Sequence, residues 1–199
     1  MYLPPALQRL WKKAMLRSAA FSGKYRKLKL LYTLEDPWDM ASEREQHRFS
    51  GALAQLREIN PRYSSILELG CGEGHQSLHL QNLTDRLYGI DLSATAIARA
   101  EARCPTATFA VAEIESAAAI FPSEKFDLIT ACEVLYYTKS LNEILPAMQA
   151  RTRRIYVSNY LQRSELMRTA FTGPGWRQLN TIRHGETVWE CFLWEDNAT

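Results

Sequence analysis

From residue 65 onward, short apolar runs alternate with longer amphipathic stretches. Short apolar runs are typical of buried strands, and apolar residues spaced three and four positions apart are typical of helices. This alternation predicts a doubly wound α/β fold, with a seven-stranded, mostly parallel sheet that ends in an antiparallel C-terminal hairpin. The predicted strands are 65–69, 86–90, 108–111, 126–132, 154–158, 176–183 and 186–194, and the predicted helices are 74–83, 93–103, 141–150 and 164–171.

The first 60 residues carry helical patterns instead of strands. Apolar positions within 5–19 form a helix-like stripe. A second helix is expected from Ser42, because Glu45 follows three residues later in a capping-box pattern. We therefore divide the chain into a helical N-terminal arm, residues 1–60, which can also act as a lid, and an α/β domain, residues 61–199.

The composition is that of a globular protein of ordinary domain size. Of the 199 residues, 46% are hydrophobic and 23% are charged, which is enough apolar material for a core. No long uninterrupted apolar run is present, so we expect neither a signal peptide nor a spanning helix. Neither Cys-x-x-Cys pairs nor zinc-ligand spacing occur, which predicts free thiols, a reducing cytoplasmic compartment and no metal site. The four cysteines are Cys71, Cys104, Cys132 and Cys191.

Charge is distributed unevenly along the chain. The net charge is +2, yet the first 34 residues hold eight basic and no acidic residues. The rest of the chain holds the other 16 of the 24 basic residues against all 22 acidic ones, a net of −6. A basic arm of this kind is compatible with a nucleic-acid contact, a membrane-surface contact or a solvated helix face, and we favour the solvated face.

The most specific feature is the run 65–74, where an apolar strand passes into a turn with the pattern Gly-x-Gly-x-Gly. Glycine lets the backbone approach a ligand and adopt torsions that are closed to other residues. A dinucleotide fingerprint would need another glycine at position 75, where His75 stands, so the spacing favours S-adenosylmethionine (SAM) over NAD. The alternative is a tight strand–helix turn without a ligand. The residues expected to cradle the cofactor are Gly70, Cys71, Gly72 and Gly74, the last opening a helix whose N-terminal amides meet a polar group of the ligand.

Acidic residues near the ends of the first three strands complete the predicted cofactor site. Asp91 ends the second strand, 21 residues after Gly70, where a carboxylate can bind both ribose hydroxyls and Leu92 follows. Glu68 can accept hydrogen bonds from the cofactor ammonium. Glu113-Ile114, after the third strand, can bind the adenine amino group and a ring nitrogen. The alternatives are a helix-flanking acid at Asp91 and a solvated loop acid at Glu113.

The fourth strand ends at Glu133, at the rim where the transferred methyl group is expected. Glu133 can contact the cofactor, orient an incoming ammonium group or remove its proton. Tyr136 and Tyr137 either wall the acceptor pocket or belong to the core. His47 is a second candidate base, so the predicted catalytic residues are Glu133, His47 and Tyr136.

These motifs together resemble the class I SAM-dependent methyltransferases over residues 65–160. A narrower resemblance, from Tyr32 onward, is to the NodS nodulation methyltransferases, and it rests on Asp36-Pro37-Trp38, on Glu45 and Arg48, and on the run 133–137. Members of that group methylate the amine of a deacetylated chitin oligosaccharide. The resemblance implies SAM as cofactor and a segment around Trp38 that closes over it, with Tyr32 and Trp38 as cofactor contacts.

We therefore predict transfer of the SAM methyl group, leaving S-adenosylhomocysteine, to a small-molecule acceptor such as an amine or an amino-sugar. The alternatives are O-methylation of a small metabolite and a module that binds SAM without turnover. A nucleic-acid substrate is disfavoured, because 133–136 reads Glu-Val-Leu-Tyr where enzymes that methylate base nitrogens commonly carry Asn/Asp-Pro-Pro-aromatic. The sequence predicts no particular oligomeric state.

Overall fold

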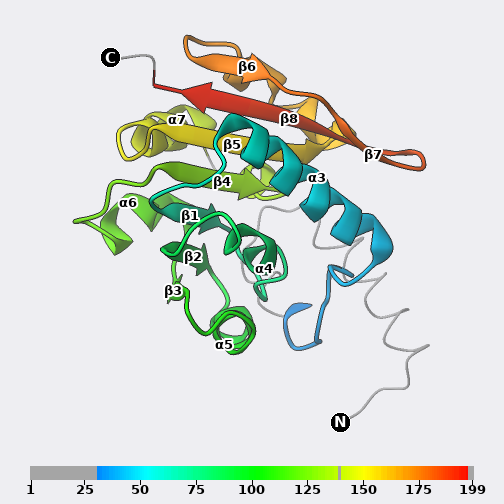
Figure 1. Cartoon of the computed structure of the whole chain (residues 1–199), viewed down its shortest axis with the longest axis vertical. Coiled ribbons are helices and arrows are strands. Elements are labelled where there is room, and N and C mark those ends of the chain that lie inside the picture. Colours follow the sequence, from blue (N-terminus) through cyan, green and yellow to red (C-terminus); the bar gives the residue numbers. More distant parts are fainter. Residues whose placement is uncertain (1–30, 139, 197–199) are drawn as a thin grey trace.

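The computed structural model describes residues 31–138 and 140–196 of the chain, and labels below follow Figure 1. The helix predicted over 5–19 lies outside these residues. The described chain forms one sheet in the order β3-β2-β1-β4-β5-β8-β6, with β7 paired to β8 as well (Figure 1). The strands are β1 (Ile66–Leu69), β2 (Leu87–Asp91), β3 (Thr108–Val111), β4 (Leu128–Cys132), β5 (Arg154–Tyr160), β6 (Trp176–Gln178), β7 (Ile182–His184) and β8 (Thr187–Glu195).

The sheet is parallel in its first five strands and antiparallel at its C-terminal edge. Strands β1 to β5 pair in parallel, and β8 runs antiparallel to β5, β6 and β7. The order reverses between β1 and β4, because β2 and β3 extend the sheet one way from β1 and the later strands extend it the other way. This arrangement confirms the doubly wound fold, and a crevice outside the carboxyl ends of β1 and β4 follows from it.

The sheet has eight strands rather than seven, because the predicted strand 176–183 is interrupted. Residues 179–181 separate β6 from β7. The carbonyl of Asn180 accepts a hydrogen bond from the side-chain amide of Gln55 on helix α3 (Glu43–Ile59), at 2.7 Å. The helix thus satisfies a carbonyl in the short segment that divides the two strands.

Helices cover both faces of the sheet (Figure 1). On one face, Ala52 and Leu56 of α3 pack with Leu80 against strand residues such as Leu128. On the other face, helix α7 (Leu141–Gln149) packs its Ile144 and the neighbouring apolar side chains against the same strands. The remaining helical segments are α4 (Ser77–Leu80), α5 (Ala94–Arg103), η1 (Ile114–Ser116), α6 (Ala117–Ile120), η2 (Leu135–Tyr137), α7 (Leu141–Gln149), α8 (Leu161–Ser164) and η3 (Arg168–Phe171).

Two predicted features of helix N-termini differ from the structure. Helix α3 lies where it was expected, but the capping box is not formed, because Ser42 makes no side-chain cap and Glu45 instead accepts from Arg48 at 2.8 Å. The helix predicted over 74–83 shrinks to α4, since Gly74 has a φ of 78° and continues the turn. A four-residue helix offers little N-terminal dipole, so it does not supply the anion site expected there.

The four cysteines are free, as the sequence predicted. Within the described residues, no helix combines the length and the apolar character that crossing a bilayer requires.

Gly74→Ala is expected to lower the free energy of unfolding by about 2 kcal/mol, since a left-handed φ is unfavourable for alanine. The added Cβ would also lie 3.0 Å from the Ala100 Cα on α5, whose backbone cannot yield easily. Urea denaturation measures the effect. Gly173→Ala is the matched control, because its nearest atom lies 4.0 Å away in the Trp176 side chain. Equal stability of the two variants would contradict the prediction.

Candidate active site

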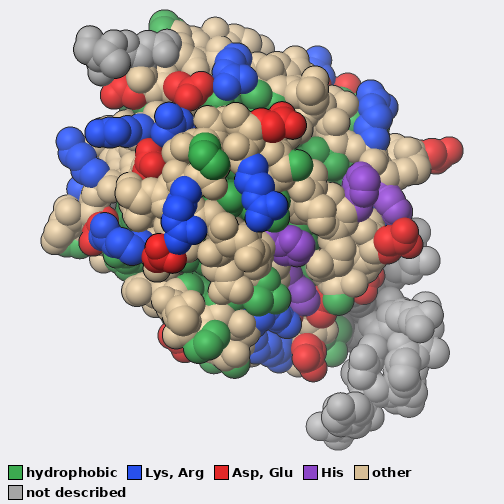
Figure 2. All heavy atoms as spheres, in the orientation of Figure 1, with side chains coloured by type: hydrophobic (Ala, Val, Ile, Leu, Met, Phe, Trp, Pro, Cys, Tyr) green, Lys and Arg blue, Asp and Glu red, His purple; other side chains and the backbone are tan. Residues whose placement is uncertain are grey.

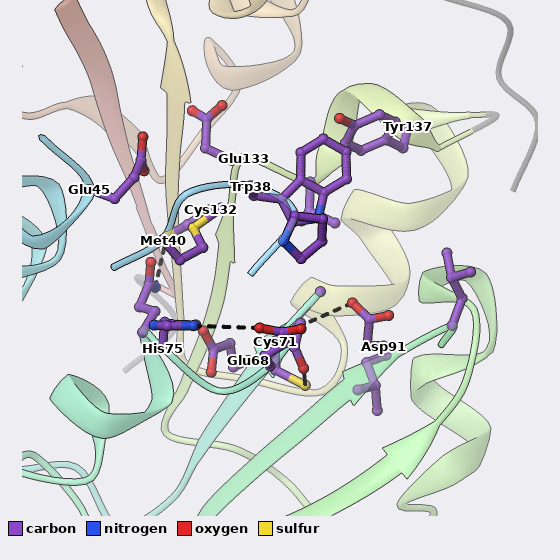
Figure 3. Close-up of a pocket in the computed structure, with 18 of the residues that line it drawn as sticks. Trp38, Met40, Glu45, Glu68, Cys71, His75, Asp91, Cys132, Glu133 and Tyr137 are labelled. Carbon is purple, nitrogen blue, oxygen red and sulfur yellow. Dashed lines mark hydrogen bonds and ion pairs between the residues drawn. The ribbon is translucent and has the colours of Figure 1, made fainter. Parts of the chain in front are cut away.

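A pocket of about 270 Å³ opens at the carboxyl ends of β1, β2 and β4, where the strand order reverses (Figure 3). This volume is near the lower end of small-molecule sites, which span roughly 300–1,000 Å³. Five chain segments line it: residues within 32–49, the glycine turn with its flanks, the end of β2, residues 112–114, and the end of β4 with the loop that follows. Residues far apart in the sequence are thus brought to one edge of the sheet.

The glycine turn forms the floor of the pocket, and its conformation requires residues without a Cβ atom. Gly70 has a φ of 68°, and a Cβ there would lie only 2.4 Å from the Val134 side chain. Gly72 has a φ of 53°, and its Cβ would meet the Tyr32 hydroxyl at 3.0 Å. Any other residue would be strained at both positions. The turn therefore fits tightly between the N-terminal segment and the loop after β4.

Asp91 faces this turn from the end of β2. One carboxylate oxygen accepts from the Gly72 N–H at 3.2 Å, and the other accepts from the Ser93 N–H at 2.9 Å. Asp91 is 9% exposed, and burial raises its pKa to about 6 despite these two hydrogen bonds. Asp91 is therefore a fixed hydrogen-bond acceptor at one end of the pocket.

Glu68 lies deeper, on β1, and is only 4% exposed. Its carboxylate accepts a 2.5 Å hydrogen bond from the Ser77 hydroxyl. Burial raises the pKa of Glu68 to about 7, and the Ser77 bond and the charge of Arg48 only partly offset this effect. Near neutral pH this carboxyl group is therefore poised between its two protonation states.

Glu133 stands on the far side of the pocket from Asp91 in Figure 3, with Trp38 drawn between them. Its φ of 57° is unusual for a residue other than glycine. The Tyr160 N–H donates to one carboxylate oxygen at 2.5 Å, and the Tyr136 hydroxyl donates to the other at 3.0 Å. Burial raises the pKa of Glu133. Two donors thus fix the orientation of a carboxylate that holds protons more tightly than usual.

The N-terminal segment closes the pocket opposite the sheet. The indole N–H of Trp38 donates to the Tyr32 hydroxyl at 3.3 Å. The backbone N–H of Asp36 donates to the Glu73 carboxylate at 3.0 Å, and Arg99 pairs with the same group at 2.5 Å. Glu73 belongs to the glycine turn itself, so the wall that carries Trp38 is tied to the floor.

Asp36, Glu73 and His75 also have possible metal-ligand atoms within 4.8 Å of one another. Both oxygens of Glu73 already accept from the Asp36 N–H, and one of them pairs with Arg99. The two oxygens of Asp36 accept from the N–H groups of Met40 and Ala41. We therefore assign this cluster to holding the N-terminal segment rather than to an ion.

The structure brings most of the predicted site residues together. Those that line the pocket are Tyr32, Trp38, Glu68, Gly70, Cys71, Gly72, Asp91, Leu92, Glu113, Ile114, Glu133 and Tyr136. Gly74 is not among them, because a side chain at this position would point toward Ala100 of α5 and not into the pocket. His47 is also outside the pocket: it is exposed on α3, with its ring 5.5 Å from that of His184. Figure 2 shows histidine side chains at the surface on the side of the molecule where α3 and β7 lie.

The pocket also contains residues for which no binding or catalytic role was predicted, among them Glu45, Arg48, Glu73 and Gln76. A signal for two of them was present in the sequence. Glu45 and Arg48 share the buried stripe of α3 with Ala52 and Leu56. Charged residues on an otherwise apolar stripe rarely occur in a core unless they are paired, so they mark a site.

Glu68→Gln is expected to stabilise the protein in a pH-dependent way. Burial raises the pKa of Glu68 to about 7 in the folded state, so the wild type loses stability as pH rises from about 4.5 to 7. The variant lacks this loss, and the difference in free energy of unfolding should widen by about 2 kcal/mol between pH 5 and pH 8. Denaturant titrations at both pH values measure it.

Glu43→Gln is the control, because it neutralises a glutamate at the start of α3 whose side chain is 94% exposed. A difference between Glu68→Gln and wild type that stayed constant with pH would show that Glu68 is ionised normally in the folded protein.

Comparison with known proteins agrees with this geometry. Residues 66–154 match the family model described as a methyltransferase domain. Nodulation protein S from Bradyrhizobium diazoefficiens is 31% identical over 120 residues, covering 58% of this chain and 56% of that protein. The Sinorhizobium fredii protein is 32% identical over 115 residues, covering 57% and 53%. The chain thus spans about half the length of these curated relatives.

Solved structures share the fold. The N-methyltransferase NodS from Bradyrhizobium japonicum WM9, in complex with S-adenosylhomocysteine, superposes with a TM-score of 0.73 at 20% identity, covering 88% of this chain and all of that one. Magnesium protoporphyrin IX methyltransferase from Synechocystis, with bound SAM, gives 0.61 at 14% identity over 95% and 97%. The strand order and the matched family model lead to one conclusion: residues 66–154 are similar to methyltransferase domains, and the chain is similar to the NodS proteins in sequence and fold.

Proposed function

We propose that this protein transfers the methyl group of SAM to an amine of a small-molecule acceptor. The observation that carries this proposal is the fixed carboxylate of Glu133, in the same pocket as the glycine turn and Asp91. SAM supplies an electrophilic methyl group on a sulfonium sulfur. The protein aligns the methyl donor with the acceptor and removes one proton from the ammonium form of the acceptor.

The residues of the pocket suit the parts of SAM. Asp91 offers a fixed carboxylate to ribose hydroxyls. Glu113 and Ile114 lie at the end of the pocket formed by the segment after β3 and can bind an adenine edge. Glu68 supplies a buried negative charge that favours an ammonium group. Tyr32 and Trp38 offer aromatic faces, which attract a sulfonium cation.

Glu133 suits an amine better than a hydroxyl group. An amine attacks readily once it is neutral, and its ammonium form has only to lose a proton to a nearby carboxylate. The raised pKa of Glu133 makes it a better acceptor of that proton than an exposed glutamate. A hydroxyl group needs a stronger base, and His47, the histidine that was a candidate, lies on the surface.

The acceptor side of the pocket has an aromatic wall. The rings of Tyr136 and Tyr137 lie with their centroids 4.5 Å apart, and both residues line the pocket. Aromatic faces pack well against the apolar faces of sugar rings, so an amino-sugar fits this wall. We also propose that residues 32–41, within the N-terminal arm of residues 1–60, act as the lid of the α/β domain of residues 61–199.

Calorimetric titration with SAM and S-adenosylhomocysteine tests the cofactor. We expect the wild type to bind with micromolar affinity. Asp91→Ala should lower this affinity about 10- to 100-fold, because the ribose hydroxyls lose the charged carboxylate that accepts their two hydrogen bonds. Asp85→Ala is the control, since its carboxylate is 85% exposed and pairs only with Arg62 among the described residues. Wild-type protein that binds neither ligand would overturn the proposal.

Glu133→Gln tests the acceptor step. Assays that transfer labelled methyl groups to glucosamine oligomers and to simple amines should show kcat/KM lower by about 10²-fold, because the amide cannot take the proton. SAM affinity should change little, since Asp91 and the glycine turn remain. The exposed Glu43→Gln serves as the control. Binding of SAM without turnover of any amine would favour a binding module, and methylation of hydroxyl groups alone would favour the O-methyltransferase alternative.

A further inference from the structure

Helix α3 and the chain that forms β7 lie side by side in a regular register. The Gln55 side chain donates to the Asn180 carbonyl at 2.7 Å. Four residues earlier on the helix, Gly51 is so close to β7 that a Cβ there would lie 3.0 Å from the Ile182 side chain. Four helical residues rise about 6 Å and two strand residues rise about 6.6 Å, so the two rows keep pace with each other.

The next step of this register brings two histidines together at the surface. His47 stands four residues before Gly51 on α3, and His184 stands two residues after Ile182 on β7. Their ring centroids are 5.5 Å apart, and the ring planes are inclined at 39°. His47 is exposed and the side chain of His184 is 32% exposed, so solutes can reach both rings. The packing of α3 on β7 therefore holds two accessible imidazoles at a fixed separation.

A carboxylate stands beside this histidine pair. Glu43 begins α3, four residues before His47, and its Oε1 lies 4.0 Å from Nε2 of His184. The Glu43 side chain is 94% exposed, so it can change its rotamer without displacing a neighbour. Apart from this contact, neither imidazole has a hydrogen-bond or ion-pair partner among the described residues. Two imidazole nitrogens and a carboxylate oxygen are thus available to one ligand.

We propose that Glu43, His47 and His184 bind a transition-metal cation such as Zn²⁺. Zn²⁺ bonds to imidazole nitrogens at about 2.0–2.1 Å, so two imidazoles on one tetrahedral ion have ring centroids about 5 Å apart. The observed 5.5 Å is close to that value, and a rotation of the Glu43 side chain supplies a third ligand atom. Imidazole ligands favour Zn²⁺ over Mg²⁺ and Ca²⁺, which prefer oxygen ligands.

The proposed ion would connect two elements that are far apart in the sequence. Its ligands come from a helix and a strand, which is why the spacing of residues along the chain does not reveal the site. The three ligands are not among the residues that line the pocket, so the site is separate from the cofactor and acceptor groups. Helix α3 nevertheless supplies Glu45 and Phe49 to the pocket lining. A bound ion would therefore fasten one wall of the pocket from the exposed face of α3.

Calorimetric titration of the metal-free full chain with ZnCl₂ tests the site. His47→Ala and His184→Ala should each weaken Zn²⁺ binding about 10-fold or more, because even the loss of a group that only orients a metal ligand costs about 10- to 100-fold. Glu43→Gln should weaken it as well, because a neutral amide oxygen replaces the charged ligand. With Zn²⁺ at about 100 times its Kd, the Tm of the wild type should rise by about 5–10 °C, because the ion binds only the folded chain.

His79→Ala is the matched control, because the His79 ring contacts Gln46 and Phe49 and lies outside the proposed ligand set. It should leave Zn²⁺ affinity unchanged, and thermal melts in EDTA establish that each variant is folded. In metal-free buffer Glu43→Gln should behave as the wild type. Wild-type protein that binds no Zn²⁺ would overturn the proposal. Binding that survives both His47→Ala and His184→Ala would also overturn it, as would equal affinity for Mg²⁺, which would indicate a general attraction of cations to surface carboxylates.

Discussion

Among the described residues, the pocket contains more buried carboxyl groups than its buried cation, Arg48, can neutralise, and its other properties depend on this imbalance. Burial raises the pKa of Glu68, Asp91 and Glu133, which means that the folded protein holds each of them at an energetic cost. Arg48 supplies one compensating charge, and Glu45 already shares it. Neutral residues that packed well in place of these buried carboxyl groups would make the protein more stable. Buried carboxyl groups that lower stability therefore point to a functional requirement. A pocket with this balance favours cationic groups, and both SAM and the proposed ammonium acceptor carry them.

The topology of the sheet brings Glu68, Asp91 and Glu133 to the same edge of the sheet. Parallel strands end at the same edge, so the reversal between β1 and β4 brings the ends of β1, β2 and β4 together. The Val134 side chain packs so closely on Gly70 that no Cβ fits between them. The loop that carries Glu133 is therefore seated directly on the glycine turn. A shift of either segment would move the Glu133 side of the pocket relative to the floor.

Local patterns predicted the fold and the residues at strand ends, because alternation and glycine spacing reflect short stretches of backbone. Asp91 and Glu133 were found since each directly follows an apolar run. His47, predicted as a candidate base, lies outside the pocket, and the sequence did not show that β7 brings His184 beside it. Arg48 received no role for a related reason: its partners Gln76 and Met40 come from other segments, and only the tertiary structure brings them to α3.

The N-terminal segment lies outside the matched domain, residues 66–154, and yet it supplies one wall of the pocket. Its backbone is strained, with positive φ at Asp36 and Asp39. The bonds from Asp36 and Arg99 to Glu73 offset that strain, because they attach the segment to the glycine turn. Glu73 occupies a variable position of the Gly-x-Gly-x-Gly pattern, where the pattern itself requires no particular side chain. The turn therefore has two functions: its glycines leave room for a ligand, and its glutamate holds the wall that closes the pocket on that side.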